Sequence, residues 1–156
     1  MRPSPARLSV AAALASLLVA SLAPPAHAAL GEPALSVAAD QTRLQAGLRA
    51  VNAGALYSTH ELQTSAGTTV REFVTPGGVV FAVSWHGPFK PDLRQLLGRS
   101  YDLYAQAPRT PGSARAGLSL DSKALVLRSG GRMRAFAGVA YLPALMPAGV
   151  TAGDLQ

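Results

Sequence analysis

The sequence has 156 residues, carries 14 lysines and arginines against 8 aspartates and glutamates, and contains no cysteine. The missing thiols exclude disulfides, thiolate metal sites and thiol catalysis. This length suits a single domain with a modest apolar core.

The first 28 residues have the layout of a cleavable secretory signal peptide. Two arginines precede an apolar run over 8–22, a Pro-Pro pair then stops a helix, and Ala26-His27-Ala28 places small residues where signal peptidase needs them. A membrane-spanning helix needs about 20 apolar residues, and the run offers 15 positions. We therefore expect cleavage before Ala29, a periplasmic or secreted location, and no transmembrane segment after cleavage.

Cleavage would remove two basic residues and no acidic one, which leaves 128 residues with a net charge of +4. The remaining charges are scattered and few aromatic residues lie among them, so we expect no specific nucleic-acid partner. A weak contact with anionic envelope surfaces is compatible with this charge. Other partners are unknown from the sequence.

Residues 29–54 form a weakly patterned N-terminal segment. Leu44, Leu48 and Val51 recur at helical spacing, which suggests a short amphipathic helix, although Gly47 and Gly54 weaken it.

Residues 55–142 have the pattern of a β-rich domain, with polar and apolar residues alternating between turn signals. Strands are expected over 55–63, 69–75, 79–85, 118–120, 125–128 and 133–142. Turns are expected at 121–123 and 129–131, and an exposed loop over 107–117.

Ser65-Ala66-Gly67-Thr68 is the first turn signal, and Pro76-Gly77-Gly78 is the second. If Pro76-Gly77 is a two-residue loop, Val74 pairs with Val79; if Gly78 is a bulge residue, the register slips by one. The segment 79–85 is the clearest strand, because its bulky apolar residues occupy the odd positions and would share one face.

A compact helix is expected over 91–98, with three leucines facing the sheet. Residues 101–105 fit either a strand or an extension of that helix, and 143–156 fit an irregular tail. The fold class that follows is mainly β (α+β). It is an antiparallel meander of five or six strands with one short helix near 91–98 and the N-terminal helix suggested above.

The most unusual local composition is the corner Trp85-His86-Gly87-Pro88-Phe89. Trp85, His86 and Phe89, together with Arg94, could line a surface for a sugar or an aromatic ligand. The alternative is that Trp85 completes an apolar face and His86 lies at a solvated strand end.

Other chemistry has weaker support. A metal site would need His60 and His86 with a carboxylate such as Glu61 or Asp92, and no spacing motif joins them. A hydrolase could combine Ser84, His86 and Asp92, but the G-x-S-x-G elbow is absent. We therefore assign no catalytic residue, no metal ligand and no cofactor.

Three positive charges lie around the hairpin tip at 128–134. They could contact phosphates or an acidic polysaccharide. A solvated turn that protects the sheet from aggregation would need the same residues.

The stretches 68–74, 81–88 and 91–98, together with the start Ala28-Ala29-Leu30-Gly31, resemble DUF2844, a family of small exported bacterial proteins of unknown function. The resemblance covers residues 29–102 and extends loosely beyond them. It implies a Gram-negative source and a periplasmic or secreted location. It carries no activity, ligand or catalytic residue.

Our leading hypothesis is a non-enzymatic binding or accessory module of the periplasm or cell envelope. A small hydrolase or carbohydrate-active enzyme that uses His86 is the alternative, and an envelope-associated structural protein is a third.

Overall fold

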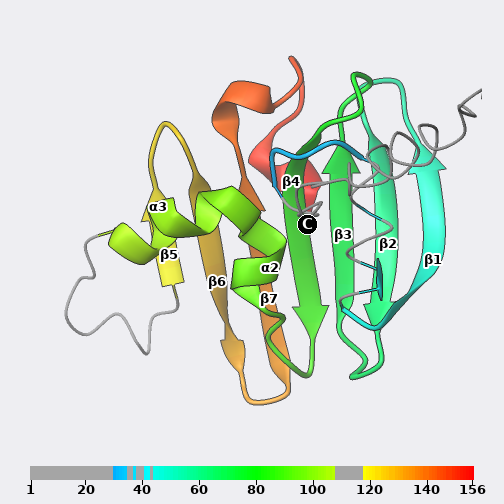
Figure 1. The fold of residues 1–156 in the computed structure, drawn as a ribbon, viewed down its shortest axis with the longest axis vertical. Helices are drawn as coiled ribbons and strands as arrows, with labels where there is room; N and C mark the ends of the chain where they lie inside the picture. Colours follow the sequence, from blue (N-terminus) through cyan, green and yellow to red (C-terminus); the bar gives the residue numbers. More distant parts are fainter. Residues whose placement is uncertain (1–29, 35–36, 38–40, 43, 108–117) are drawn as a thin grey trace, which may run out of the picture.

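The computed structural model describes residues 30–34, 37, 41–42, 44–107 and 118–156. Its main feature is a seven-stranded antiparallel sheet in the order β1-β2-β3-β4-β7-β6-β5 (Figure 1). The strands are β1 (Ala46–Ala53), β2 (Ser58–Thr64), β3 (Thr69–Val74), β4 (Val80–Gly87), β5 (Leu118–Asp121), β6 (Val126–Arg132) and β7 (Ala135–Tyr141). The short helices are α2 (Leu93–Leu97), η1 (Gly98–Ser100), α3 (Tyr101–Gln106), η2 (Pro143–Leu145) and η3 (Ala152–Leu155).

Two meanders make up the sheet. Strands β1 to β4 follow one another, the chain then leaves through α2, η1 and α3, and β5 to β7 return so that β7 pairs with β4. The expected β-rich antiparallel fold is confirmed. Seven strands are present instead of five or six, because β1 adds one at the edge of the sheet.

The expected amphipathic helix through Leu44, Leu48 and Val51 is wrong, since Ala46–Ala53 is strand β1. Pairing with β2 satisfies the backbone groups on one side of this segment. Gly47 and the β-branched Val51 disfavour a helix there, so sheet pairing overrides the spacing of the apolar residues.

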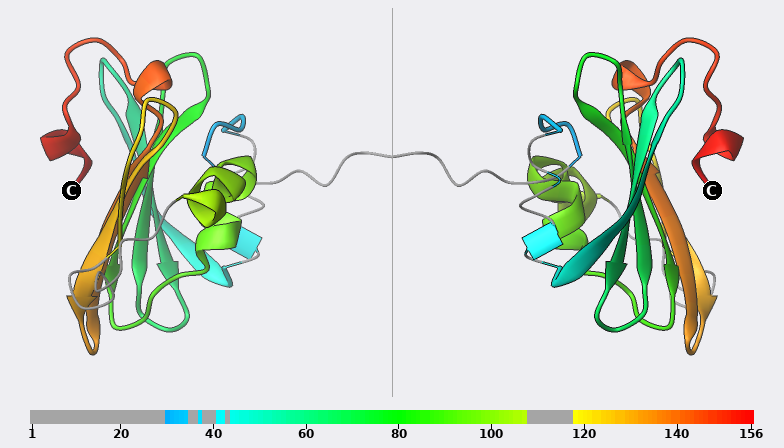
Figure 2. Two further views of the ribbon diagram at one scale, coloured as in Figure 1. Left: turned by 90° about the vertical axis from the view of Figure 1, so that its left-hand side faces the viewer. Right: turned by 90° about the vertical axis from the view of Figure 1, so that its right-hand side faces the viewer.

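The sheet has a different layer on each side (Figure 2). The helices α2 and α3 cover one side, here called the helix face, and the chain's last residues cross the other, here called the strap face. The helix expected near 91–98 is confirmed as α2, whose N-cap Asp92 accepts a hydrogen bond of 2.8 Å from the Arg94 amide. The following residues continue as helix in η1 and α3, so 101–105 is not a strand.

A β-bulge at Phe81 changes the faces of β4. Val74 pairs with Val80 whereas Phe73 pairs with Ala82, which leaves Phe81 as an extra residue. Val83 and Trp85 therefore pack in the cluster on the helix face, and Phe81 packs in the cluster on the strap face. The expectation that the odd positions of 79–85 share one face is wrong for this reason.

The turn before β4 spans three residues, because Thr75 and Val79 are joined by a backbone hydrogen bond of 2.9 Å. Gly78 has a φ of 77°, which a glycine adopts without steric cost. A two-residue loop at Pro76-Gly77 is therefore excluded. The bulge at Phe81 then shifts the pairing of β3 with β4 by one further residue.

The hairpin between β6 and β7 turns at Met133-Arg134, since Arg132 pairs with Ala135. The turn expected at 129–131 lies inside β6. The last residues are also more ordered than an irregular tail, because η2 and η3 form there and Leu155 is fully buried. Hydrogen bonds from Thr151 to the Asp154 carboxylate close a capping box on η3.

Trp85 of β4 packs tightly against Gly138 of β7. These residues are cross-strand partners, and a Cβ on Gly138 would overlap the Trp85 ring atoms Cζ2 and Cε2. We expect Gly138→Ala to lower the free energy of unfolding by about 1–3 kcal/mol, because the indole must move. Chemical denaturation would measure this. Gly130→Ala is the matched control, since a Cβ at that position meets no atom within 4 Å. Equal stability of the two variants would contradict this packing.

His60 lies on the helix face, opposite Glu72 in the register of β2 and β3. Burial lowers the pKa of His60, because the charged imidazolium loses hydration. The unfolded chain therefore binds this proton more readily, and stability is lost as the pH falls below about 6.5. We expect His60→Gln to reduce the loss of stability between about pH 7 and pH 5, measured by denaturation at each pH. If the free energy of unfolding fell equally with pH in the two proteins, the contribution assigned to His60 would be contradicted.

Candidate functional site

The four residues proposed from the sequence as a ligand surface do not come together. Trp85 is 2% exposed and packs in the core on the helix face, whereas its neighbour His86 is exposed and points to the strap face. Phe89 is 57% exposed in the loop after β4, and Arg94 places its guanidinium 4.5 Å from the Tyr101 ring centroid. Trp85 therefore has the core role that was the alternative reading.

The residues of the candidate hydrolase are also separated. Ser84 and His86 lie on the same side of β4, about 6.7 Å apart along the strand. Asp92 caps α2 beyond the end of that strand. This arrangement lacks the nucleophile-to-base hydrogen bond that activates a serine.

The two histidines that would form a metal site lie on opposite faces of the sheet. His60 shares the helix face with Leu62, and His86 lies on the strap face. Among the described residues, no three His, Asp or Glu side chains come close enough to hold a metal ion.

The strap face is divided into an apolar part and a polar part. The apolar part is one row across β3, β4, β7 and β6, made of Phe73, Ala82, Tyr141 and Val126. It is covered by Val150 and Leu155, which belong to the same buried cluster. Residues 150–156 are called the C-terminal strap below.

The next row toward the β6–β7 turn is mainly polar. In register across four strands it contains Ser84, Val139, Arg128 and Ser119. The row beyond it contains His86, Ala137 and Gly130. Since Ala137 and Gly130 have little or no side chain, they leave a low floor between the larger residues.

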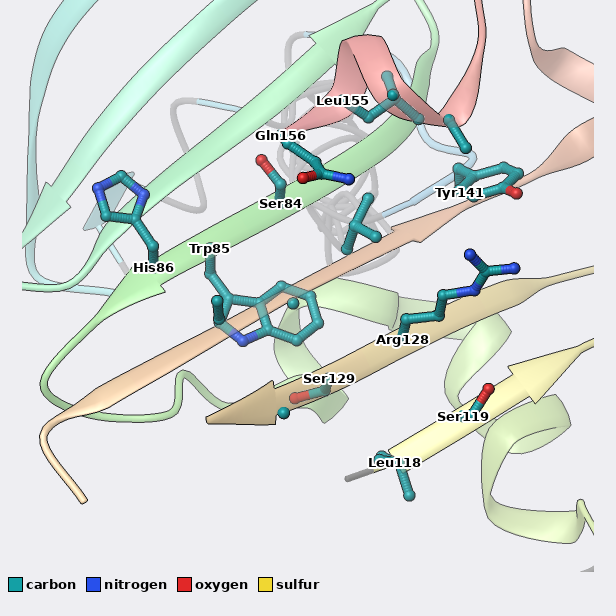
Figure 3. Close-up of a pocket in the computed structure, with 16 residues that line it drawn as sticks. Ser84, Trp85, His86, Leu118, Ser119, Arg128, Ser129, Tyr141, Leu155 and Gln156 are labelled. Atoms are coloured by element: carbon teal, nitrogen blue, oxygen red, sulfur yellow. The ribbon is translucent and has the colours of Figure 1, made fainter. Parts of the chain in front are cut away.

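These two rows and the strap enclose a shallow hollow of about 750 Å³ (Figure 3). Figure 3 shows His86 and Arg128 on opposite sides of the hollow, with Ser84 and Gln156 between them. Ala152, Gly153 and Leu155 of the strap line its upper wall. Trp85 and Ser129, whose side chains lie on the helix face, also border it.

Arg71 holds the end of the strap in place. Its Nε donates a hydrogen bond of 3.0 Å to Glu61, and its Nη1 donates one of 3.3 Å to the backbone oxygen of Gln156. The last residue of the chain is therefore fixed beside the hollow, and its side chain contributes to the lining.

Among the described residues that line the hollow, Arg128 is the only lysine, arginine, aspartate or glutamate. Arg128 is 61% exposed and lies 3.5 Å from Asp121, a solvated ion pair that contributes little to stability. By the alternation of β6, Arg132 lies on the same face two rows away. The arrangement offers a cation, an imidazole and several hydroxyl and amide groups over a low floor.

The sequence had pointed to His86 and Ser84, and it had noted Arg128 only as part of a hairpin tip. Ser119, Ala137 and Gln156 were missed, because their proximity depends on β7 pairing with β4. A signal was present in the small residues Gly130, Ala137 and Gly138, which are unusual inside paired strands.

Within the described residues, no helix has the length and apolar character needed to cross a membrane. A family model described as "Protein of unknown function (DUF2844)" matches residues 26–155. No curated protein and no solved structure matches the chain. Since the match covers most of the sequence and includes every described element, this protein belongs to the DUF2844 family.

Proposed function

We propose that this protein is exported and works as a non-enzymatic binding module, with the hollow on the strap face as its ligand site. The observation that carries the proposal is the division of that face. The apolar row is covered by the strap, whereas His86, Arg128, Ser119 and Ala137 of the adjoining rows are exposed and border a hollow of about 750 Å³.

The hollow has the properties of a binding site rather than of a surface irregularity. Its volume falls in the range of small-molecule sites, and a few polar groups stand in a largely apolar lining, as is typical of such sites. These groups are carried by paired strands and by a strap that Arg71 anchors, so they are held on rigid elements.

The hydrolase alternative has less support from the geometry. Ser84 and His86 are spaced too far apart along β4 for a direct hydrogen bond, and Asp92 is engaged as a helix cap. His86 is exposed and is well placed to contact a ligand lying across the strands.

Support for export comes from the arginines, apolar run and Ala26-His27-Ala28 site in the first 28 residues. We expect the chain isolated from a Gram-negative host to begin at Ala29, as read by mass spectrometry of the extracytoplasmic fraction. Ala28→Tyr should leave the precursor uncleaved, because the last position before the cut must be small. His27→Tyr is the matched control and should be processed normally. A full-length chain retained in the cytoplasm would refute export.

Binding in the hollow is tested by filling it. Ala137 is exposed on the floor, so Ala137→Phe should block the site without disturbing the core. We expect at least one probe from a panel of inorganic phosphate, hexaglutamate, and neutral and acidic galacto-oligosaccharides to raise the melting temperature. A ligand at 100 times its Kd stabilises a protein by about 2.7 kcal/mol.

The matched control is Ala105→Phe, which adds the same ring at an exposed position of α3. The probe should stabilise this variant as it stabilises the original protein, and it should not stabilise Ala137→Phe. No stabilisation by any probe, or equal stabilisation of both variants, would overturn the assignment of the site.

A further inference from the structure

We propose that the ligand of the hollow is an acidic saccharide, whose hydroxyls contact Ser119, Gln156 and His86 and whose carboxylate pairs with Arg128. This inference rests on the proposed function and names the class of ligand. It is carried by the charge, the hydrogen-bonding groups and the shape of the two polar rows.

The charge favours an anion. Arg128 projects from the middle of the polar row, and its described ionic partner, Asp121, is 3.5 Å away and 69% exposed. Such a contact is weak in water and leaves guanidinium donors free for a second carboxylate. Arg132 adds positive charge on the same face. A carboxylate brought to Arg128 would form a charge-assisted hydrogen bond, which is stronger than a neutral one.

The neutral polar groups favour a ligand with many hydroxyls. Ser119 and Gln156 are exposed at the border of the hollow, where Ser84 is mostly covered and contributes little surface (Figure 3). Hydroxyl and amide groups both donate and accept hydrogen bonds, as sugar hydroxyls do. The polar row crosses four strands and so spans about 14 Å, which is the extent of a short oligosaccharide rather than of a single small anion.

The floor fits flat rings. Ala137 and Gly130 are neighbours in register, and a Cβ at Gly130 would meet no atom within 4 Å. A ring can therefore lie close to the sheet between His86 and Arg128. The apolar CH face of a sugar would contact the Ala137 methyl group while its hydroxyls reach the rim.

A peptide fits the same surface less well. Peptides bind sheets mainly by pairing with a free edge, and helical peptides need an apolar groove. The floor of the hollow lies on β4, β7 and β6, which are paired on both sides, whereas β5, which carries Ser119, is an edge strand. A peptide that paired with the free edge of β5 would therefore lie beside the floor and would not cross it.

The test uses trigalacturonate and its methyl ester, which share every ring and hydroxyl and differ in charge. Calorimetric titration of the purified protein should show binding of the acid, and about tenfold weaker binding of the ester, because a charged hydrogen bond is lost. Arg128→Gln should weaken binding of the acid by a similar factor and leave the affinity for the ester unchanged. This pattern identifies the carboxylate as the partner of Arg128.

Lys123→Gln is the control for net charge, since Lys123 is exposed in the β5–β6 turn and does not line the hollow. Its Kd for the acid should lie within about twofold of that of the original protein, as expected for a remote and screened charge. Melting temperatures of both variants would verify that they are folded.

Three results would overturn the inference. They are equal affinity for the acid and its ester, no effect of Arg128→Gln, or binding of hexaglutamate as tight as that of trigalacturonate. In each case the effect of Ala137→Phe remains a separate readout. If that variant blocks a neutral sugar or a peptide, the hollow is still the binding site and only the ligand class is wrong.

Discussion

The bulge at Phe81 in β4 is the constraint on which both layers of this protein depend. An unbroken strand would send Phe81 to the same side as Val83 and Trp85. The extra residue turns Phe81 to the strap face, where its ring lies 6.3 Å from that of Phe73 and joins the cluster that holds Leu155. The central strand thus has apolar side chains for two cores, and the chain's last residues have a surface on which to pack.

That second core also explains where the open surface begins. The strap covers the apolar row as far as Gln156, whose backbone oxygen accepts a hydrogen bond from Arg71, the partner of Ser84 on β3. Beyond this point β4 and β7 present His86 and Ala137 to solvent, whereas Ser84, beside the strap, is only 7% exposed. Trp85, on the other side of the same strand, is committed to packing against Gly138. The core on the helix face and the candidate site on the strap face therefore use opposite sides of β4. On the strap face, the strap marks where the covered apolar row ends and the exposed surface begins.

Local patterns predicted the antiparallel strands, helix α2 and the family, because turns, caps and alternation act over a few residues. The same patterns misplaced the face of Phe81, since a bulge depends on what the partner strand and the strap require. They also mistook β1 for a helix, because Leu48 and Val51 are three positions apart, and only the register shift between Leu48 and Ala50 brings both to one face of a strand. The sequence predicted the candidate site only in part. His86 was noted, whereas Ser119 and Ala137 reach it only through the long-range pairing of β7 with β4.

The central claim is that the two faces of β4 differ in role, with packing on the helix face and ligand binding on the strap face. A residue-resolved NMR titration with trigalacturonate tests it most directly. The account predicts that amide shifts change at Ser84, His86, Ser119, Arg128, Ala137 and Gln156. It also predicts that those of α2 and of Tyr101 stay unchanged. Shifts centred on Phe89, Arg94 and the helices, with none on β6 and β7, would contradict it.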